Sequence, residues 1–140
     1  MKFWDTSALM PLCLKEPQTE KIQSLVQKDD DLVAWWGTLI EGYSALAGLR
    51  REQVLTGEEE GQSRQVFLRL SSQWTEIRPS NLVRDQASRV LLLHPLRVAD
   101  ALQLAAALVW SGSQTTSLEF VCLDHRLREA AAREGFQVIP

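Results

Sequence analysis

The chain has 140 residues, of which 45% are hydrophobic and 24% are charged, and its formal net charge is −3 at pH 7. The length predicts one domain over residues 1–140, and no apolar run approaches the roughly 18 residues needed to cross a bilayer, so we expect no membrane segment. The negative charge argues against nucleic-acid binding through bulk charge, so any such contact must be local. Asp5 interrupts the short apolar start, which is unlike a signal peptide, and we expect a cytoplasmic protein.

Short apolar runs alternate with helical patterns, without an internal repeat or a linker. Pro11 is expected to shorten the first helix, Pro79 to end the third strand and Gly135 to close the last helix. This alternation predicts a parallel sheet covered by helices. In chain order, the sequence predicts a strand at 1–4, a helix from about 6, a helix at 19–28, a strand at 32–36, a helix at 38–52, a loop or helix start at 56–64, a helix at 63–73, a strand at 74–79, helices at 81–93 and 96–110, a strand at 119–123, a helix from 125 and a strand at 136–139.

Three acidic residues stand beside predicted element ends. Asp5 and Asp124 each follow a predicted strand directly, and ligands of such sheets bind beyond the carboxyl ends of the strands. Each is also a favoured N-cap for the helix that follows it. Glu41 stands three residues after Thr38, which predicts a capping box. Helix capping therefore stays open as the role of each residue taken alone.

Asp100 lies in RVADALQLAAAL, a segment that is otherwise almost wholly apolar. Such a composition predicts a buried helix. If that helix begins near Pro95, Asp100 lies beyond the unpaired N–H groups of the first turn and is no ordinary cap. A buried carboxylate needs a neutralising partner. The alternatives are an ion pair with Arg97 or another arginine, and a bound cation. Gln103 lies one turn on and can bond to the same partner.

Taken together, two carboxylates come from strand ends on one edge of the sheet and two from helices whose starts can point at that edge. Four carboxylates in one place repel one another and disfavour ionisation, so their convergence predicts a bound cation. Oxygen ligands favour a hard ion, Mg²⁺ or Mn²⁺, and Mg²⁺ commonly shares its coordination with phosphate. This chemistry points to phosphodiester hydrolysis.

The same segments resemble a family. FWDTSAL, TLIEGYSAL, LRVADALQLAAAL and FVCLDHRLREAAAREGFQVI are similar, in order and spacing, to the PIN-domain nucleases, and among them to the VapC-type toxins of toxin–antitoxin pairs. The resemblance covers nearly the whole chain. It implies an α/β/α sandwich with a parallel sheet, an Mg²⁺- or Mn²⁺-dependent endoribonuclease activity, frequent dimerisation and inhibition by a small antitoxin.

The resemblance also assigns individual residues. Thr6 and Ser7 match the hydroxyl-bearing positions after the first aspartate, and together with Gln103 they are expected to support the site or contact substrate. Cys122 departs from the family, since many relatives have Thr, Ser or Asn two residues before the last aspartate. The family's acidic metal-binding and catalytic positions fall on Asp5, Glu41, Asp100 and Asp124.

Arginine and tryptophan supply further candidates for contact with RNA. The alternative for the arginines is an ordinary solvated charge near a helix end, and for the tryptophans it is core or interface packing. The arginines expected to contact RNA phosphates are Arg50, Arg51, Arg126 and Arg128. The tryptophans considered for stacking are Trp35, Trp36, Trp74 and Trp110.

Other side chains are expected to be structural. Cys13 and Cys122 lack CxxC spacing, which argues against zinc and favours small core residues. Trp4 is expected in the core. His94 is expected at the beginning of the helix at 96–110, and His125 at the surface.

Three other functions compete with this interpretation. An aspartyl phosphatase would carry an aspartate at position 7, where this chain has serine, and a receiver domain would need a lysine after a late strand, where none occurs. The serious alternative is a PIN-like protein- or RNA-binding module with weak or absent catalysis. In either case, the apolar surface around Leu46, Leu49 and Phe67 is expected to help form a dimer or antitoxin interface.

Overall fold

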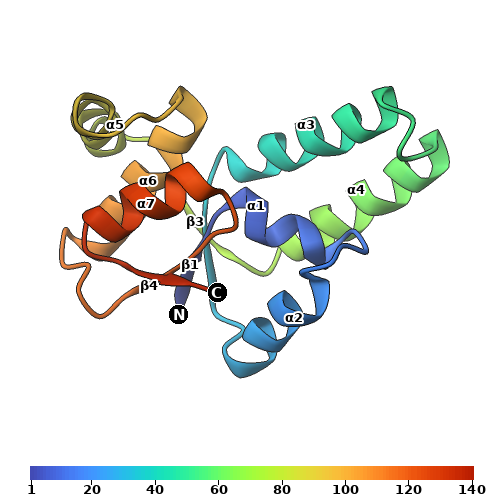
Figure 1. Ribbon diagram of the computed structural model, residues 1–140, viewed down its shortest axis with the longest axis horizontal. Coiled ribbons are helices and arrows are strands. Elements are labelled where there is room, and N and C mark those ends of the chain that lie inside the picture. The colour runs from blue at the N-terminus through green and yellow to red at the C-terminus, as the bar shows by residue number, and fades with distance from the viewer.

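A parallel sheet of five short strands forms the centre of the computed structural model, which describes residues 1–140 (Figure 1). The strand order is β3-β2-β1-β4-β5, so Phe3 of the central strand is paired with Val33 on one side and Phe120 on the other. The chain adds β2 and β3 on one side of β1 and then returns to add β4 and β5 on the other. The strands are β1 (Lys2–Trp4), β2 (Leu32–Trp35), β3 (Thr75–Ile77), β4 (Glu119–Val121) and β5 (Gln137–Ile139).

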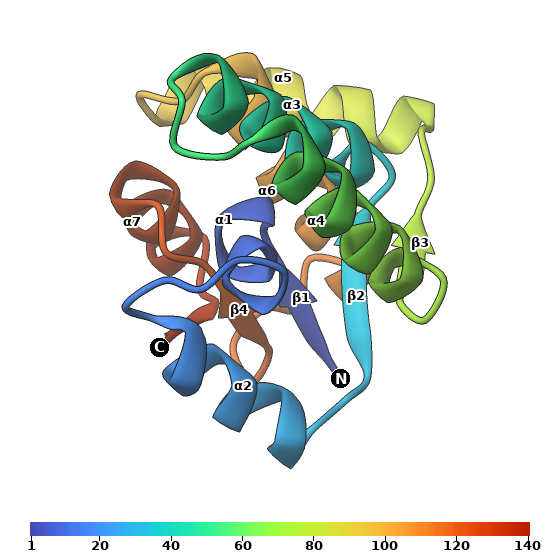
Figure 2. The same cartoon turned by 90° about the vertical axis from the view of Figure 1, so that its right-hand side faces the viewer.

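Helices cover both faces of the sheet, which confirms the α/β/α sandwich (Figures 1 and 2). One layer consists of α1 (Thr6–Leu9), the 3-10 turn η1 (Met10–Leu12), α2 (Thr19–Lys28), α3 (Thr38–Arg51) and α4 (Gly57–Ser71). The other layer consists of α5 (Asn81–Leu93), α6 (Val98–Ser111) and α7 (His125–Arg133). None of these helices is both long enough and apolar enough to cross a membrane.

Side chains of β1 alternate between two hydrophobic clusters because successive residues of a strand point to opposite faces. Phe3 stacks on Phe120 with ring centroids 5.3 Å apart and belongs to the cluster under α5, α6 and α7. Trp4 belongs to the cluster under the other helices, and both side chains are fully buried. The prediction that Trp4 is a core residue is therefore confirmed.

The antiparallel pair α3 and α4 extends to one side of the sheet (Figure 1) and packs closely near its base. A Cβ atom at Gly42 would lie 2.0 Å from Phe67, so only glycine permits this approach. Leu46 and Phe67 are 0% exposed. The expectation that these two side chains form an interface with another protein is therefore wrong, because they fill the contact between α3, α4 and the sheet.

Two helices begin at residues that differ from the prediction. Helix α4 begins at Gly57 rather than 63, so residues 56–64 form a helix start and not a loop, because Thr56 and Glu59 form a complete capping box. Helix α6 begins at Val98 rather than 96, since Arg97 still has an extended backbone. Asp100 is consequently the third residue of α6, inside its first turn.

Candidate active site

A shallow hollow of about 410 Å³ at the carboxyl edge of the sheet brings together the four predicted carboxylates. Asp5 follows β1 directly, and Asp124 lies in the loop after β4, the neighbouring strand at which the strand order reverses. The hollow therefore lies where open parallel sheets commonly bind ligands. Its lining consists of Asp5, Thr6, Ser7, Glu41, Ser44, Ala45, Ala99, Asp100 and Asp124.

Asp5 is buried and is held by the first turn of α1. Its Oδ2 atom accepts hydrogen bonds from the backbone N–H of Ser7 at 3.0 Å and from the Ser7 hydroxyl at 2.5 Å. Asp5 is thus an N-cap as predicted, although the helix that it caps has only four residues. Burial raises the pKa of the Asp5 carboxyl, and the hydrogen bonds from Ser7 offset only part of that rise.

Ser7 joins the two strand ends that carry the aspartates. While its hydroxyl donates to Asp5, the same oxygen accepts from the backbone N–H groups of Leu123 at 2.9 Å and Asp124 at 3.3 Å. The Ser7 side chain therefore fixes the loop after β4 against the end of β1. Ser7 was expected to support the site or contact substrate, and these bonds give it a supporting position.

Cys122 occupies the position where the family resemblance leads us to expect Thr, Ser or Asn. Its buried thiol lies 3.6 Å from Asp5 Oδ2 and 3.5 Å from the carbonyl oxygen of Asp124. Burial raises the pKa of this thiol well above its ordinary value, so the sulfur stays protonated and acts as a weak donor to Asp5. The thiol thus gives Asp5 only a weak hydrogen bond.

Glu41 does not take part in the predicted capping box. The N-cap of α3 is Gly37, and no capping hydrogen bond forms there. Instead, Glu41 Oε2 accepts from the Thr6 hydroxyl at 2.7 Å and from the Gln103 amide. Burial raises the pKa of the Glu41 carboxyl, as do the charges of Asp5 and Asp100, while the two hydrogen bonds lower it.

Asp100 does not form an ion pair with an arginine, which the sequence left open as the alternative to cation binding. No arginine nitrogen lies within 4.0 Å of its carboxylate, although the positive charges of Arg97 and Arg126 act on it. Burial, followed by the charges of Asp124 and Asp5, raises the pKa of Asp100 in spite of the two arginines. Its place in the first turn of α6 is favourable for a carboxylate because of the helix dipole.

Asp124 is the exposed member of the set. It is the N-cap of α7, and its Oδ1 atom accepts from the backbone N–H of Leu127 at 2.9 Å. Helix capping, which the sequence left open for this residue, is therefore one of its roles. The bond occupies a single carboxylate oxygen, so capping does not prevent Asp124 from facing the hollow with the other.

The donor set of the hollow fits a hard divalent cation that keeps part of its water. Four carboxylates line one hollow, and none of them forms an ion pair with a basic side chain. No three acidic, histidine or cysteine side chains lie close enough together to form a ready metal-binding cluster. Mg²⁺ is commonly held by only one or two carboxylates together with water and phosphate oxygens. The chemistry of the donors therefore suits Mg²⁺ or Mn²⁺ without a complete protein cage.

The four candidate arginines are placed differently. Arg126 is exposed and acts electrostatically on Asp100. Arg128 instead donates to two backbone carbonyl oxygens, those of Cys122 at 2.6 Å and Pro140 at 2.7 Å. Arg50 and Arg51 lie in the last turn of α3, roughly 14 Å and roughly 15 Å along the helix axis from Glu41. Sequence reasoning missed Arg97 as a neighbour of the hollow, since it was considered only as an ion-pair partner.

His94 is not at the beginning of a helix as expected. It is the C-cap of α5, and its buried ring bonds through Nε2 to Glu134 at 2.8 Å. The proline at position 95 explains this end, because a residue before proline is driven into the extended conformation that His94 has. His125 is 86% exposed in its side chain, as predicted.

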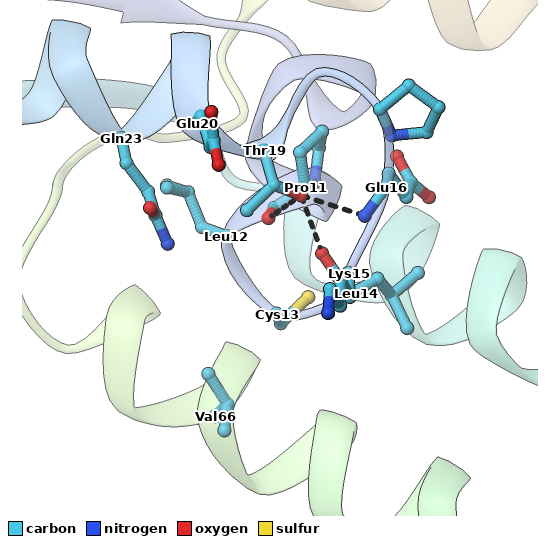
Figure 3. A pocket seen from close by; sticks show the side chains of 11 residues that line it. Pro11, Leu12, Cys13, Leu14, Lys15, Glu16, Thr19, Glu20, Gln23 and Val66 are labelled. Carbon is cyan, nitrogen blue, oxygen red and sulfur yellow. Dashed lines mark hydrogen bonds between the residues drawn. The ribbon is translucent and has the colours of Figure 1, made fainter.

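A larger hollow, of about 730 Å³, lies away from the carboxylates, between η1, α2 and α4 (Figure 3). Leu12, Cys13 and Leu14 line it from the segment after α1, and Val66 lines it from α4. The hydroxyl of Thr19 fixes this segment, because it accepts from the N–H of Glu16 at 2.9 Å and lies within 3.0 Å of two carbonyl oxygens. This hollow contains no cluster of carboxylates.

No family model and no curated protein matches this sequence. Solved structures do match. FitAcB from Neisseria gonorrhoeae aligns with a TM-score of 0.69 at 17% identity, over 100% of this chain and 97% of that chain. A toxin-antitoxin complex from Klebsiella pneumoniae aligns with a TM-score of 0.60 at 16% identity, over 89% and 87%. PAE2754 from Pyrobaculum aerophilum aligns with a TM-score of 0.67 at 20% identity, over 98% and 87%. At these identities the likeness shows a shared fold.

Proposed function

We propose that this chain is an Mg²⁺- or Mn²⁺-dependent endoribonuclease that hydrolyses RNA phosphodiester bonds and serves as the toxin of a toxin–antitoxin pair. The observation that carries the proposal is the set of four carboxylates in one hollow without a basic partner. Such a set is unfavourable on its own, because burial and mutual repulsion oppose the ionised forms. A bound cation relieves that cost.

The residues that would hold the ion are Asp5, Glu41, Asp100 and Asp124. When bound, such an ion lowers the pKa of a coordinated water and stabilises the charge that develops on a phosphate. The chain itself supplies orientation. Ser7 fixes Asp5 against the loop that carries Asp124, and Thr6 fixes Glu41. Neither histidine is needed, because His94 is bonded to Glu134 and His125 is exposed on α7.

We expect two exposed arginines to attract the RNA backbone. Arg97 and Arg126 both act electrostatically on Asp100, so a phosphate group beside the carboxylates would lie within their field. Arg128 contributes less to such contacts, since its guanidinium is bonded to backbone carbonyls. Arg50 and Arg51 would serve only an RNA long enough to reach the far end of α3.

A small antitoxin would have the larger hollow in Figure 3 available as a docking place. Its lining combines apolar side chains, such as Leu12 and Val66, with charged ones, such as Lys15 and Glu20. That mixture is typical of protein interfaces, which have apolar centres and polar margins. The Klebsiella pneumoniae neighbour was solved as a toxin-antitoxin complex, and the shared fold supports our expectation of a comparable partner.

A second copy of the chain would cover a different face. Large apolar side chains are exposed at the starts of α3 and α6 and along α5, namely Ile40, Val98, Leu82 and Leu92. A large contiguous apolar patch marks an interaction site, and we expect these side chains to contribute to one. We therefore expect a homodimer through this face, and the change Leu92→Asp should yield a monomer by light scattering while circular dichroism remains unchanged. A wild type that is already a monomer contradicts this expectation.

The first experiment is a titration of Mn²⁺ into the wild type and Asp100→Asn, by calorimetry or water-proton relaxation, with circular dichroism to verify folding. Binding by the wild type that the folded variant loses supports the nuclease. Cleavage assays on RNA follow, because an unsuitable RNA gives a false negative. The absence of binding by both proteins at millimolar Mn²⁺ contradicts the proposal.

The second candidate is a PIN-like module that binds protein or RNA without cleaving it. Two observations favour it, namely the absence of a ready three-ligand cluster and the thiol of Cys122 in place of a hydroxyl beside Asp5. Such a module would tolerate Asp100→Asn without losing its partner. Retained RNA binding together with absent Mn²⁺ binding would therefore favour the module over the enzyme.

A further inference from the structure

Gln103 is a polar side chain on the interior face of an otherwise apolar helix. It is 1% exposed, and its neighbours along α6 include Leu104, Ala105 and Ala106, all of which are fully buried. A glutamine gains nothing from such surroundings unless its amide is hydrogen-bonded. Its retention there calls for a specific partner.

The Gln103 amide nitrogen lies against one carboxylate and two hydroxyls. Nε2 donates to Glu41 Oε2 and lies 2.9 Å from Thr38 Oγ1 and 3.0 Å from Thr6 Oγ1. An amide nitrogen has two hydrogens, and the Thr6 hydroxyl gives its own hydrogen to Glu41. The two amide hydrogens therefore suffice for Glu41 and Thr38. This single side chain joins α1, α3 and α6 beneath the hollow.

The other end of the same amide is unsatisfied. Gln103 Oε1 is buried and has no hydrogen-bond partner. Turning the amide over would remove the donor from Glu41 and place a carbonyl oxygen against its carboxylate. The observed orientation therefore serves Glu41 and leaves the amide oxygen unpaired, which is unfavourable for stability.

We infer that Gln103 is a positioning residue that, anchored on Thr38, holds the Glu41 carboxylate and the Thr6 hydroxyl in place for metal binding, at the expense of protein stability. The inference rests on the proposed function. Thr38 thereby acquires a role that the sequence did not indicate, since it was predicted to cap α3. Side chains that orient metal ligands through hydrogen bonds are part of the design of a metal site.

The test compares Mn²⁺ affinity with thermal stability in Gln103→Leu. Leucine fills nearly the same volume, removes both amide hydrogens and removes the unpaired oxygen. We expect the Mn²⁺ dissociation constant to rise about tenfold, as for other residues that orient ligands, while the unfolding midpoint changes little, because removal of the unpaired oxygen offsets the lost bonds to Glu41 and Thr38. Gln86→Leu, on α5 where its amide oxygen accepts only from Arg89, is the matched control and should leave Mn²⁺ binding unchanged.

A second pair of variants, at Thr38 on α3, tests the hydrogen bond that anchors the Gln103 amide. Thr38→Val removes the hydroxyl that anchors Gln103 and should weaken Mn²⁺ binding severalfold, whereas Thr38→Ser should restore it. A purely structural role would give a different result, because the loss of affinity would follow the loss of stability in every variant. This pair keeps the test decisive if Gln103→Leu does not fold.

The outcomes separate the inference from the proposed function. Unchanged Mn²⁺ affinity in folded Gln103→Leu, or a lack of rescue by Thr38→Ser, overturns the role of Gln103 and leaves the metal site standing. Absence of Mn²⁺ binding by the wild type overturns the metal site itself, and the role of Gln103 with it. Weaker Mn²⁺ binding by Gln103→Leu without lower stability supports both the role of Gln103 and the metal site.

Discussion

Two clusters of charged side chains in this molecule differ in whether basic side chains neutralise their carboxylates. Near the end of α7, Glu134 bonds to Arg89 Nη2 and His94 Nε2, each at 2.8 Å. Burial alone would raise the pKa of Glu134, but these partners hold it below its ordinary value. In the hollow, Glu41 and Asp100 have no basic partner within ion-pair distance, and the pKa of each is raised.

The difference separates a structural cluster from a functional one. A carboxylate that is already neutralised by neighbouring basic side chains stabilises the fold and is not free to bind a cation. A group of carboxylates without such neighbours is unfavourable in its ionised form until a cation binds. In such a group, perturbed pKa values indicate a functional site. Matched substitutions in the two clusters test this distinction.

The largest effect should come from removing the charge of Asp5. Asp5→Asn should lower Mn²⁺-dependent RNA cleavage at least about 100-fold, since loss of a metal ligand removes several kcal/mol of charge stabilisation. Cleavage is measured on a mixed RNA substrate under single-turnover conditions. Glu134→Gln is the control and should cleave like the wild type. Equal loss of activity in both variants would contradict the distinction.

The next effect concerns stability in the paired cluster. Glu134→Ala removes the partner of Arg89 and of the buried His94 ring, whose Nδ1 atom already lacks one. We expect a loss of about 1–3 kcal/mol in the free energy of unfolding, the usual cost of leaving a buried polar group unpaired. Urea unfolding at pH 7 measures it. Unchanged Mn²⁺ binding by this variant should accompany the loss.

The pH dependence of stability should have opposite signs in the two clusters. Because the pKa values of Glu41 and Asp100 are raised by folding, the metal-free folded chain binds more protons than the unfolded chain between the ordinary and raised values. Their contribution to stability therefore falls as pH rises through that window. The lowered pKa of Glu134 has the reverse effect, since its contribution is present above the ordinary value and is lost as pH falls through the folded value.

Thermal unfolding without divalent metal tests these signs. Glu41→Gln should unfold at a higher temperature than the wild type at pH 7, by about 3 °C for each kcal/mol regained, and the gain should vanish near pH 4. Glu134→Gln should unfold at a lower temperature at pH 7, and that deficit should shrink in acid. A lower midpoint for Glu41→Gln at pH 7 would show that the carboxylate stabilises the metal-free fold.

The smallest effect should come from an exposed pair. His125 lies 3.2 Å from Glu129 on the surface of α7, with both side chains more than half exposed. His125→Ala should change the free energy of unfolding by less than about 0.5 kcal/mol. It should also leave RNA cleavage unchanged. A clear loss of cleavage would make His125 a substrate contact.

The sequence predicted elements and their order better than it predicted contacts. The parallel sheet covered by helices, the core position of Trp4 and the closing glycine at 135, which has a φ of +100°, were all accessible, because they depend on local periodicity and backbone sterics. The strand order was not, because the choice of neighbours for β1 depends on packing between distant segments. Leu46 and Phe67 were taken for surface because an apolar stripe does not say what covers it.

The candidate site shows the same division. Its four carboxylates and Gln103 could be named from residue types at predicted strand ends and helix starts. The hydrogen bonds of these side chains could not be predicted. A capping box was expected at Thr38 and Glu41, but the structure has one at Thr56 and Glu59 and none at the start of α3. Both pairs have the same spacing. What differs is the tertiary environment, since Thr6 and Gln103 offer Glu41 alternative partners from distant parts of the chain.

The pairing of β1 with β4 has a consequence for how the protein is made. Asp5 and Asp124 meet because residues 2–4 and 119–121 are neighbouring strands, and the Ser7 hydroxyl closes the contact. A ribosome synthesises the chain from its N-terminus, so the strand that pairs with β1 on this side is absent until residues 119–121 have been made. The four carboxylates therefore come together only after β4 and Asp124 have been synthesised, more than 100 residues after Asp5.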